Sequence, residues 1–590
     1  MYLFKKTIIM KKYFSIFLIT AAFFSSCSDE RVLDKEPLSL ITDAQVWQSE
    51  DLIDAYLNDL YRRSLFLNTS GQSGFNCMLD ASMAGELRVF GPWQTPYQAS
   101  GYIINETGPH GSMAYFNPIY TIGDLVSGMI DKIETESNLS DDVKNAKIAE
   151  ARFIRAYAYF HGVKRYGGIP LIDYVQDYED VESLQVPRSS EQEVYDFIAA
   201  EMDEAAKYLS ESADASSGRA SKWAALALKS RAMTYAGSIG EYGTIQLDGL
   251  LGIANPDAYW QAAYDASKQI IEESGHALYS KSGDKAQNFQ ELFIDENNSE
   301  VIFSEIFDEA LLKTHSYGEL TMPGGFNVVW GSNNQVFYDT VQMFDFADGT
   351  PAADIDITRA EGWSVEELFE NRDPRFIASI FYPEAEWQGG KVYFHKRTLN
   401  ADQAPEDWPA KCHPRNDSSK NNRTGFMLRK RLDEGRTEPR GGLDGTDYIV
   451  FRLGEIYLNM AEAAFHLGMT GEALDAINTV RARAGMPART ALTWDNIMQE
   501  RQVELFAEDH RYWDLRRWRT AVDALDGKKF KALLYDYDAA TDRYIITTKD
   551  AEGNRNNGRA RVFQERHYYF PFGINKLAAV PALVENPGYN

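Results

Sequence analysis

The 590-residue chain has few cysteines and histidines, and its basic residues are outnumbered by acidic ones. Its three cysteines rule out a disulfide-rich scaffold and form no C-x-x-C pair, and its nine histidines show no metal-ligand spacing. With 60 Lys and Arg against 87 Asp and Glu, the formal net charge is −27. Such a surface repels phosphate backbones and anionic lipid. The composition therefore argues against nucleic acid binding and favours a neutral ligand.

The motifs that usually carry catalysis are also missing. The chain has no G-x-S-x-G nucleophile elbow, no G-x-x-x-x-G-K phosphate loop and no H-E-x-x-H zinc helix. Glycoside hydrolysis requires two carboxyl groups at a defined separation across a cleft, and spacing along a chain does not reveal such a pair. A non-catalytic binding protein is the favoured interpretation, with a surface glycoside hydrolase as the alternative.

Only the N-terminus carries a long apolar run. Four lysines within the first twelve residues precede the apolar stretch Tyr13–Phe24, and small residues then lead to Cys27. This order is typical of a secretory signal, and the run is shorter than the ~20 residues that a membrane helix needs. Cys27 favours lipoprotein processing, with acylation of its thiol, over an ordinary signal peptide. The acids Asp29 and Glu30 resemble an export signal for the outer face of the outer membrane.

The other two cysteines, Cys77 and Cys412, follow this signal and therefore belong to a compartment where disulfides can form. Two alternatives stay open. The two residues form a disulfide, or they are separate buried thiols.

Helical periodicity dominates both ends of the mature chain. Apolar residues recur at three- and four-residue spacings in segments 42–65, 120–135, 141–166, 189–209, 221–236, 256–274, 451–467, 471–484 and 493–518. Ser190 and Glu193 have the spacing of a capping box, and Gly167, Gly168 and Pro170 are stop signals after residue 166. Small residues within 457–485 predict a tetratricopeptide-type helix pair.

The middle of the chain has a different character. Between residues 289 and 447, and again within 71–111, Gly, Pro and Asn interrupt short apolar runs, and the tail after Asp526 mixes loop and strand. We predict a mostly α fold, in which a tetratricopeptide-like scaffold of helical pairs packs against a loop-rich lobe with few short strands. The predicted divisions are a signal at 1–26, an N-terminal helical region at 27–285, and a C-terminal region at 286–590 that includes the loop-rich lobe and helices within 451–518.

One predicted helix is densely charged. Its charged residues are Glu500, Arg501, Glu504, Glu508, Arg511, Asp514, Arg516 and Arg517. Alternating signs on a helix are usually structural, and arginine pairs well with carboxylates in bidentate geometry. The pattern predicts an ion-pair network that locks this helix to its neighbours, in preference to a catalytic carboxylate pair.

The loop-rich regions contain the candidate ligand contacts. Sugars stack their apolar faces on aromatic rings and hydrogen-bond through their hydroxyls. The candidate aromatic and polar residues are Asp80, Arg88, Trp93 and Tyr97 within 71–111, and Tyr317, Phe326, Trp330 and Asn333 between residues 289 and 447. Asp345 and Asp348 lie in an Asp-rich turn whose oxygens are calcium candidates, although the spacing is not that of an EF-hand and a solvated turn is the alternative. No other cofactor is expected.

Several motifs occur in a characteristic order. They are A-E-A-R-F-I-R-A-Y at 149–157, Y-G-G-I-P-L at 166–171, R-D-P-R at 372–375, R-L-G-E-I-Y-L-N at 452–459 and H-R-Y-W-D-L-R-R-W at 510–518. Together with the lipoprotein signal they make the chain resemble the SusD/RagB family of outer-membrane glycan-binding lipoproteins over nearly all of its mature length. The chain departs from the family at its end, where 586–589 lacks the usual Gln-Asn pair.

The resemblance implies a function. It implies a surface lipoprotein that binds oligo- or polysaccharide without catalysis and delivers it, as a lid, to a SusC-type TonB-dependent porin. Asp80 and Arg88 fall in one of the two stretches that form the aromatic arc of the family's starch-binding member, and Trp330 falls in the other. The alternative, suggested by the RagB branch of the family, is uptake of peptide or protein ligands by the same lid and porin.

Overall fold

The computed structural model describes residues 42–64, 66, 78–89, 104–105, 108–109, 113–212, 214–247, 249–324, 326, 331–395, 397–400, 423–436, 441–551 and 560–589. Cys27, Cys77, Cys412, Trp93, Tyr97 and Trp330 lie outside these ranges, so their predicted roles stay predictions. Within the described ranges, no helix has both the length and the apolar character needed to cross a membrane.

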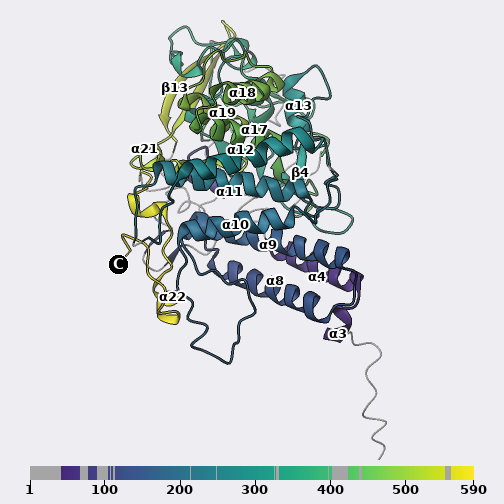
Figure 1. Cartoon of the computed structure of the whole chain (residues 1–590). Coiled ribbons are helices and arrows are strands. Elements are labelled where there is room, and N and C mark those ends of the chain that lie inside the picture. Colours follow the sequence, from purple (N-terminus) through teal and green to yellow (C-terminus); the bar gives the residue numbers. More distant parts are fainter. Residues whose placement is uncertain are drawn as a thin grey trace, which may run out of the picture.

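A stack of helices forms the scaffold (Figure 1). Its N-terminal members are α3 (Asp43–Val46), α4 (Glu50–Arg63), α8 (Phe116–Glu136), α9 (Asp141–Tyr166), α10 (Glu191–Ala205), α11 (Lys222–Tyr242) and α12 (Pro256–Glu273). From α8 to α12 each helix packs on the next, and α12 packs on α17 (Leu453–His466), which pairs with α18 (Thr470–Ala484). This arrangement confirms the mostly helical fold of stacked pairs. The predicted division at residue 286 stays a prediction.

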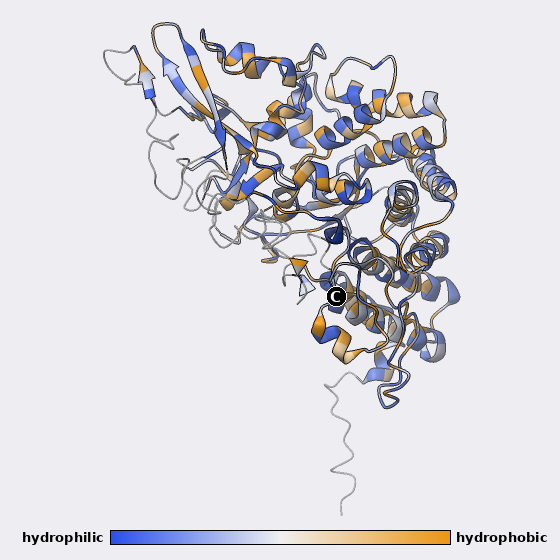
Figure 2. Cartoon of the chain, turned by 90° about the vertical axis from the view of Figure 1, so that its left-hand side faces the viewer, coloured by the Kyte–Doolittle hydropathy of each residue, from blue (hydrophilic) through white to orange (hydrophobic). Residues whose placement is uncertain are grey.

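Local sequence explains the limits of the scaffold helices. Helix α9 spans the predicted residues 141–166, with acids in its first turn, Lys164 and Arg165 in its last turn, and Gly167 at φ 70° after its end. Ser190 and Glu193 form the predicted capping box of α10. Figure 2 shows apolar and polar residues alternating along the helices, as expected of elements that bury one face and expose the other.

Two segments predicted as single helices are each broken in two. Segment 42–65 separates into α3 and α4, because Ser49, at the N-cap position of α4, has an extended backbone. Segment 493–518 separates into α19 (Trp494–Glu504) and α20 (Arg511–Arg517). Ala507 and Asp509 between them have left-handed φ values of 56° and 63°, which a helix does not tolerate. Apolar periodicity continues across both breaks and therefore did not reveal them.

The loop-rich lobe contains only short strands. They pair as β1 (Leu87–Val89) with β5 (Asn334–Val336), β2 (Ile104–Asn105) with β3 (Gly108–Pro109), β4 (Val301–Glu305) with β11 (Tyr448–Arg452), β6 (Ile380–Phe381) with β10 (Met427–Leu428), and β7 (Glu386–Trp387) with β8 (Gly390–Lys391). The one three-stranded sheet of the described ranges joins β12 (Lys531–Asp538) to β13 (Arg543–Asp550) and to β9 (Arg397–Leu399). Short helices connect them: α6 (Leu79–Met83), α13 (Lys285–Glu291), α14 (Tyr317–Thr321), α15 (Tyr338–Val341), α16 (Pro374–Ser379), α21 (Ala521–Leu525) and α22 (Ile574–Ala579).

The predicted ion-pair network is present and buried. Glu504, at the end of α19, is fully enclosed and contacts Arg375, Arg452 and Arg483, with Arg452 Nη1 at 2.7 Å and Arg375 Nη1 at 3.0 Å. Burial alone would raise the pKa of the Glu504 carboxyl, but the three guanidinium groups hold this pKa well below its usual range. Arg452 also holds Glu508 at 2.7 Å.

The network continues to both sides of Glu504. Arg375 and Arg481 contact the two oxygens of Glu500 at 2.6 and 2.7 Å. Arg501 and Arg517 both bind Asp514 on α20 at 2.9 Å. The segment from α19 to α20 is therefore tied to the loop-rich lobe, to α18 and to the strand before α17, which confirms the structural interpretation of its charges.

We predict that Glu504→Gln lowers the free energy of unfolding by ~3–5 kcal/mol, because it leaves three buried guanidinium groups without a full counter-charge. Chemical denaturation measures this change. The control is Asp59→Asn, since Asp59 pairs with Arg62 and Arg63 on the exposed side of α4 and such pairs contribute ~1 kcal/mol or less. Equal effects of the two substitutions would contradict the structural role of the network.

Candidate functional site

The strand pair β1–β5 brings together the two loop regions that the sequence singled out. Its antiparallel register places Leu87 opposite Val336, Arg88 opposite Gln335 and Val89 opposite Asn334. The chain therefore leaves β1 towards Trp93 at the same end of the pair at which it arrives in β5 from the direction of Trp330. Two loop bases that are far apart in sequence share one short ladder of main-chain hydrogen bonds.

The segment before β1 is tightly packed. All five residues of α6 are buried, and Met78 before it has a left-handed φ of 47°. Gly85 follows at φ 79°, where a Cβ atom would lie 2.2 Å from the ring of Phe530; only glycine fits there. The Glu86 carbonyl accepts hydrogen bonds from the Phe337 amide at 3.1 Å and from the Thr340 hydroxyl at 2.9 Å. These contacts fix β1 to the segment that follows β5.

The candidate residues within the described ranges are held inside this packing. Asp80 Oδ2 accepts a hydrogen bond from Trp513 Nε1 at 2.9 Å, and Arg88 Nη1 donates to the Ala551 carbonyl at 2.5 Å. The Tyr317 hydroxyl donates to the Lys430 carbonyl at 2.7 Å. Asn333 and Phe326 are buried as well, with 7% and 4% of their surface exposed. In this structure all five side chains support the bases of the loops and face away from solvent.

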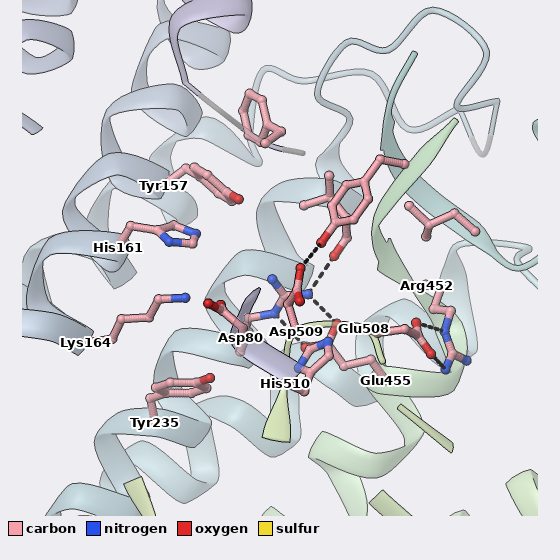
Figure 3. Close-up of a pocket in the computed structure, with 15 residues that line it drawn as sticks. Asp80, Tyr157, His161, Lys164, Tyr235, Arg452, Glu455, Glu508, Asp509 and His510 are labelled. Carbon is pink, nitrogen blue, oxygen red and sulfur yellow. Dashed lines mark hydrogen bonds and ion pairs between the residues drawn. The ribbon is translucent and has the colours of Figure 1, made fainter. Parts of the chain in front are cut away.

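A small polar cavity lies beneath α6 (Figure 3). It measures about 50 Å³ and is lined by Asp80, by His161 and Lys164 of α9, by Tyr235 of α11, and by Asp509 and His510 from the break between α19 and α20, among others. The Lys164 and Asp80 side chains point towards one another across it. Sequence analysis did not identify this group, although His161 and Lys164 were visible as polar positions in the apolar second half of α9.

The polar groups that line the cavity are suited to binding water molecules. Burial, followed by the charges of nearby lysine and arginine, lowers the pKa of His161 well below its usual range, and burial lowers that of Lys164 in the same way. Asp80 Oδ1 and His161 Nε2 have no hydrogen-bond partner among the described residues. A polar space of this size holds a few water molecules, which would satisfy these atoms.

The calcium candidates do not form a metal site with other described residues. Asp345 accepts a hydrogen bond from Gln499 at 3.1 Å, and burial raises the pKa of its carboxyl. Asp348 accepts from the Thr350 amide at 2.8 Å within its own turn. Across the part of the chain that the structure describes, no three His, Cys, Asp or Glu side chains gather as metal ligands would.

A larger groove of about 540 Å³ lies between α13, α16 and residues 429–434. Acidic and amide side chains line it, including Glu291 and Asp433, together with the apolar residues Ile294 and Ile377. It has no aromatic lining residue and so offers no ring on which a sugar could stack.

Glu86 generates a pH-dependent prediction. Its side chain is buried beneath β1, and burial raises its pKa to about 8 although Arg511 opposes the shift. This folded-state pKa exceeds the ordinary value of 4.5. Between these two pH values, the Glu86 carboxyl keeps its proton in the folded state and loses it in the unfolded state. The contribution of this group to stability is therefore complete below about pH 4.5 and is lost as the pH rises towards about 8.

We predict that Glu86→Gln makes the melting temperature fall less than in the parent chain between about pH 5 and pH 8, because the amide stays neutral throughout this window. Thermal unfolding at a series of pH values measures the difference. Glu211→Gln, at an exposed carboxylate that pairs with Lys222, is the control and should follow the parent profile. A Glu86→Gln profile parallel to the parent would show that Glu86 is ionised in the fold.

Comparison with known proteins gives consistent matches. A family model described as "SusD family" matches residues 299–589, and one described as "Starch-binding associating with outer membrane" matches residues 33–233. A SusD-like protein of Bacteroides ovatus is 25% identical over 529 residues, which cover 87% of this chain and 83% of that protein.

Solved structures show the same fold. A SusD-like protein from Bacteroides fragilis aligns with a TM-score of 0.74 at 24% identity, over 94% of this chain and all of that one. A second protein of this species, described as a SusD-like carbohydrate-binding protein, aligns with a TM-score of 0.69 at 23% identity, over 91% of this chain and all of that one. Helical stacking with a lobe of loops and short strands is therefore a shared architecture.

Proposed function

Because the chain belongs to the SusD/RagB family, we propose that it is an outer-membrane lipoprotein, anchored through Cys27, that binds oligo- or polysaccharide at the cell surface. In this proposal it acts without catalysis and delivers the glycan to a SusC-type TonB-dependent porin. The description of the N-terminal family model, which names starch binding and the outer membrane, supports the proposal. So does the structural neighbour described as carbohydrate-binding.

The observation that carries the proposal is the pairing of β1 with β5. It joins the bases of the two segments that contain Trp93, Tyr97 and Trp330, and aromatic side chains are the groups on which sugar rings stack. The base is rigid because Asp80, Arg88 and Asn333 are buried and hydrogen-bonded within the protein. A rigid base beside segments that contain aromatic residues suits selective binding of a neutral, ring-shaped ligand.

The carboxylates of the charged segment support binding without catalysis. Glu500, Glu504, Glu508 and Asp514 are all buried and paired with arginines. A glycosidase needs one proton-donating acid and one ionised carboxylate on either side of an open cleft. These four groups are enclosed and do not meet that requirement.

Calorimetric titration of the mature protein against a panel of complex glycans tests the proposal. We expect saturable binding of at least one glycan and no new reducing ends after prolonged incubation. Binding of peptides with no glycan bound would favour the alternative of peptide uptake. New reducing ends that a single Asp or Glu substitution abolishes would instead establish a glycoside hydrolase.

We predict that Trp93→Ala and Trp330→Ala each weaken glycan binding at least tenfold while leaving the melting temperature nearly unchanged, because each removes a stacking ring from a loop. Calorimetry and thermal unfolding of the same samples measure both effects. The control is Trp387→Ala, since Trp387 is fully buried and its truncation costs ~3–5 kcal/mol of stability. A large fall in melting temperature for Trp330→Ala would mark Trp330 as a core residue.

A further inference from the structure

Exposed apolar side chains gather at one end of the molecule. Among the described residues, ten large apolar side chains are exposed, and six of them belong to one neighbourhood: Tyr174, Val175, Tyr178, Val181, Ile574 and Val584. The first four lie in the loop 172–186 between α9 and α10, where Tyr178 is 62% and Val181 68% exposed. Soluble monomers rarely display such clusters unless another molecule covers them.

The loop holds these side chains in water although it is itself well anchored. The Tyr159 hydroxyl donates to the Ile172 carbonyl at 3.1 Å and accepts from the Ile172 amide at 2.8 Å, and Arg155 donates to the Asp173 carbonyl. Further along, the nearby Asp124 carboxylate of α8 raises the pKa of the Tyr178 hydroxyl. Asp177 and Asp180 each accept hydrogen bonds from main-chain amides two residues later. The exposure is therefore a property of an ordered loop.

The C-terminal segment lies beside the base of this loop. Arg188 Nη1 donates to the Val584 carbonyl at 2.7 Å, and Lys576 of α22 donates to Asn117 of α8 at 2.6 Å. Loop 172–186, α22 and α8 lie together at the lower end of the molecule in Figure 1, which is also the end from which α3 begins. We call the surface formed by loop 172–186, Ile574 and Val584 the acidic end.

The charge of the acidic end limits what can cover it. Residues 166–187 include five acids, Asp173, Asp177, Glu179, Asp180 and Glu182, and no lysine or arginine. None of the five forms an ion pair with another described side chain. An anionic lipid surface would be repelled, whereas a protein with apolar sockets and a basic rim would match both the aromatic side chains and the carboxylates.

The chain between Cys27 and the first described residue, Thr42, limits how far the molecule can lie from the membrane. Fourteen residues lie between Cys27 and Thr42, so the two are at most about 50 Å apart along a fully extended chain. If Cys27 is acylated, the end of the molecule that carries α3 stays within that distance of the membrane.

We propose that the acidic end is the docking surface for an integral outer-membrane protein whose exposed face carries apolar sockets ringed by lysine and arginine. This inference rests on the proposed function, because it names the surface through which the lid contacts its transporter. Tyr174, Val175, Tyr178 and Val181 insert into the sockets, and the five carboxylates pair with the basic rim.

Site-specific photo-crosslinking in the cell that makes the protein tests the proposal. A photoreactive phenylalanine analogue replaces Tyr178 or Val181 in the full chain, and a third version carries it at Leu312, which is 81% exposed in a different part of the molecule. We expect positions 178 and 181 to give one high-mass product at least tenfold above position 312, identified by mass spectrometry as an integral outer-membrane protein. Equal yields at all three positions, or products only with lipid or a second copy of the chain, would overturn the proposal.

A matched pair of surface variants separates docking from glycan binding. One carries Tyr174→Ser, Val175→Ser, Tyr178→Ser and Val181→Ser, and the control carries Leu311→Ser and Leu312→Ser. We expect both to keep the parent melting temperature and glycan affinity, and only the first to lose at least tenfold of the co-purifying outer-membrane protein. Full retention by the first variant overturns the docking surface, whereas failure of the parent chain to bind any glycan counts against the proposed function alone.

Discussion

A buried carboxylate surrounded by arginines connects the main parts of this molecule. Glu504 meets Arg375 from the loop-rich lobe, Arg452 from the end of β11 and Arg483 from α18. Each of these groups would be costly to bury alone, and together they neutralise one another. Two residues between α19 and α20 have left-handed backbone conformations. They end the helix before Glu508, whose carboxylate joins the same network.

The site depends on the network through α20. Trp513 of α20 donates to Asp80 in α6, and Arg511, the first residue of α20, acts electrostatically on Glu86 just before β1. The ion pairs thus fix α19 and α20, α20 positions α6 and β1, and β1 pairs with β5 at the bases of the aromatic loops. A ligand-binding site needs this kind of support, because its selectivity depends on how precisely the contact groups are held.

Part of this structure follows from local sequence and part does not. Helix α9 was predicted at its observed limits, since acids, basic residues and Gly167 mark its ends. The capping box of α10 and the structural ion-pair role of the charged segment were predicted for similar local reasons. The break at Ala507 and Asp509 was not predicted, because alanine does not favour a left-handed conformation and aspartate adopts one only in a minority of cases. Burial of the charged side chains also comes only from the tertiary fold.

The sequence predicted which residue types the site contains better than it predicted where their side chains point. The resemblance to the SusD/RagB family implied that the regions near residues 80–97 and 317–334 work together, and β1–β5 shows that segments from both meet. It did not reveal which way each side chain points: Asp80, Arg88 and Tyr317 are of types that suit sugar binding, yet all three are buried. Residue type reports which contacts a side chain is able to make, whereas burial depends on packing against distant segments such as Trp513 and Ala551.

The β1–β5 pair has a consequence for how such proteins diversify. Its three residue pairs are joined through the main chain, so the ladder itself does not depend on the side chains of the segments beyond its ends. The main-chain hydrogen bonds of this pair therefore stay available when the side chains of the segments that follow residue 89 and precede residue 334 change. Such a joint would let the ligand contacts change while the base beneath them keeps its geometry.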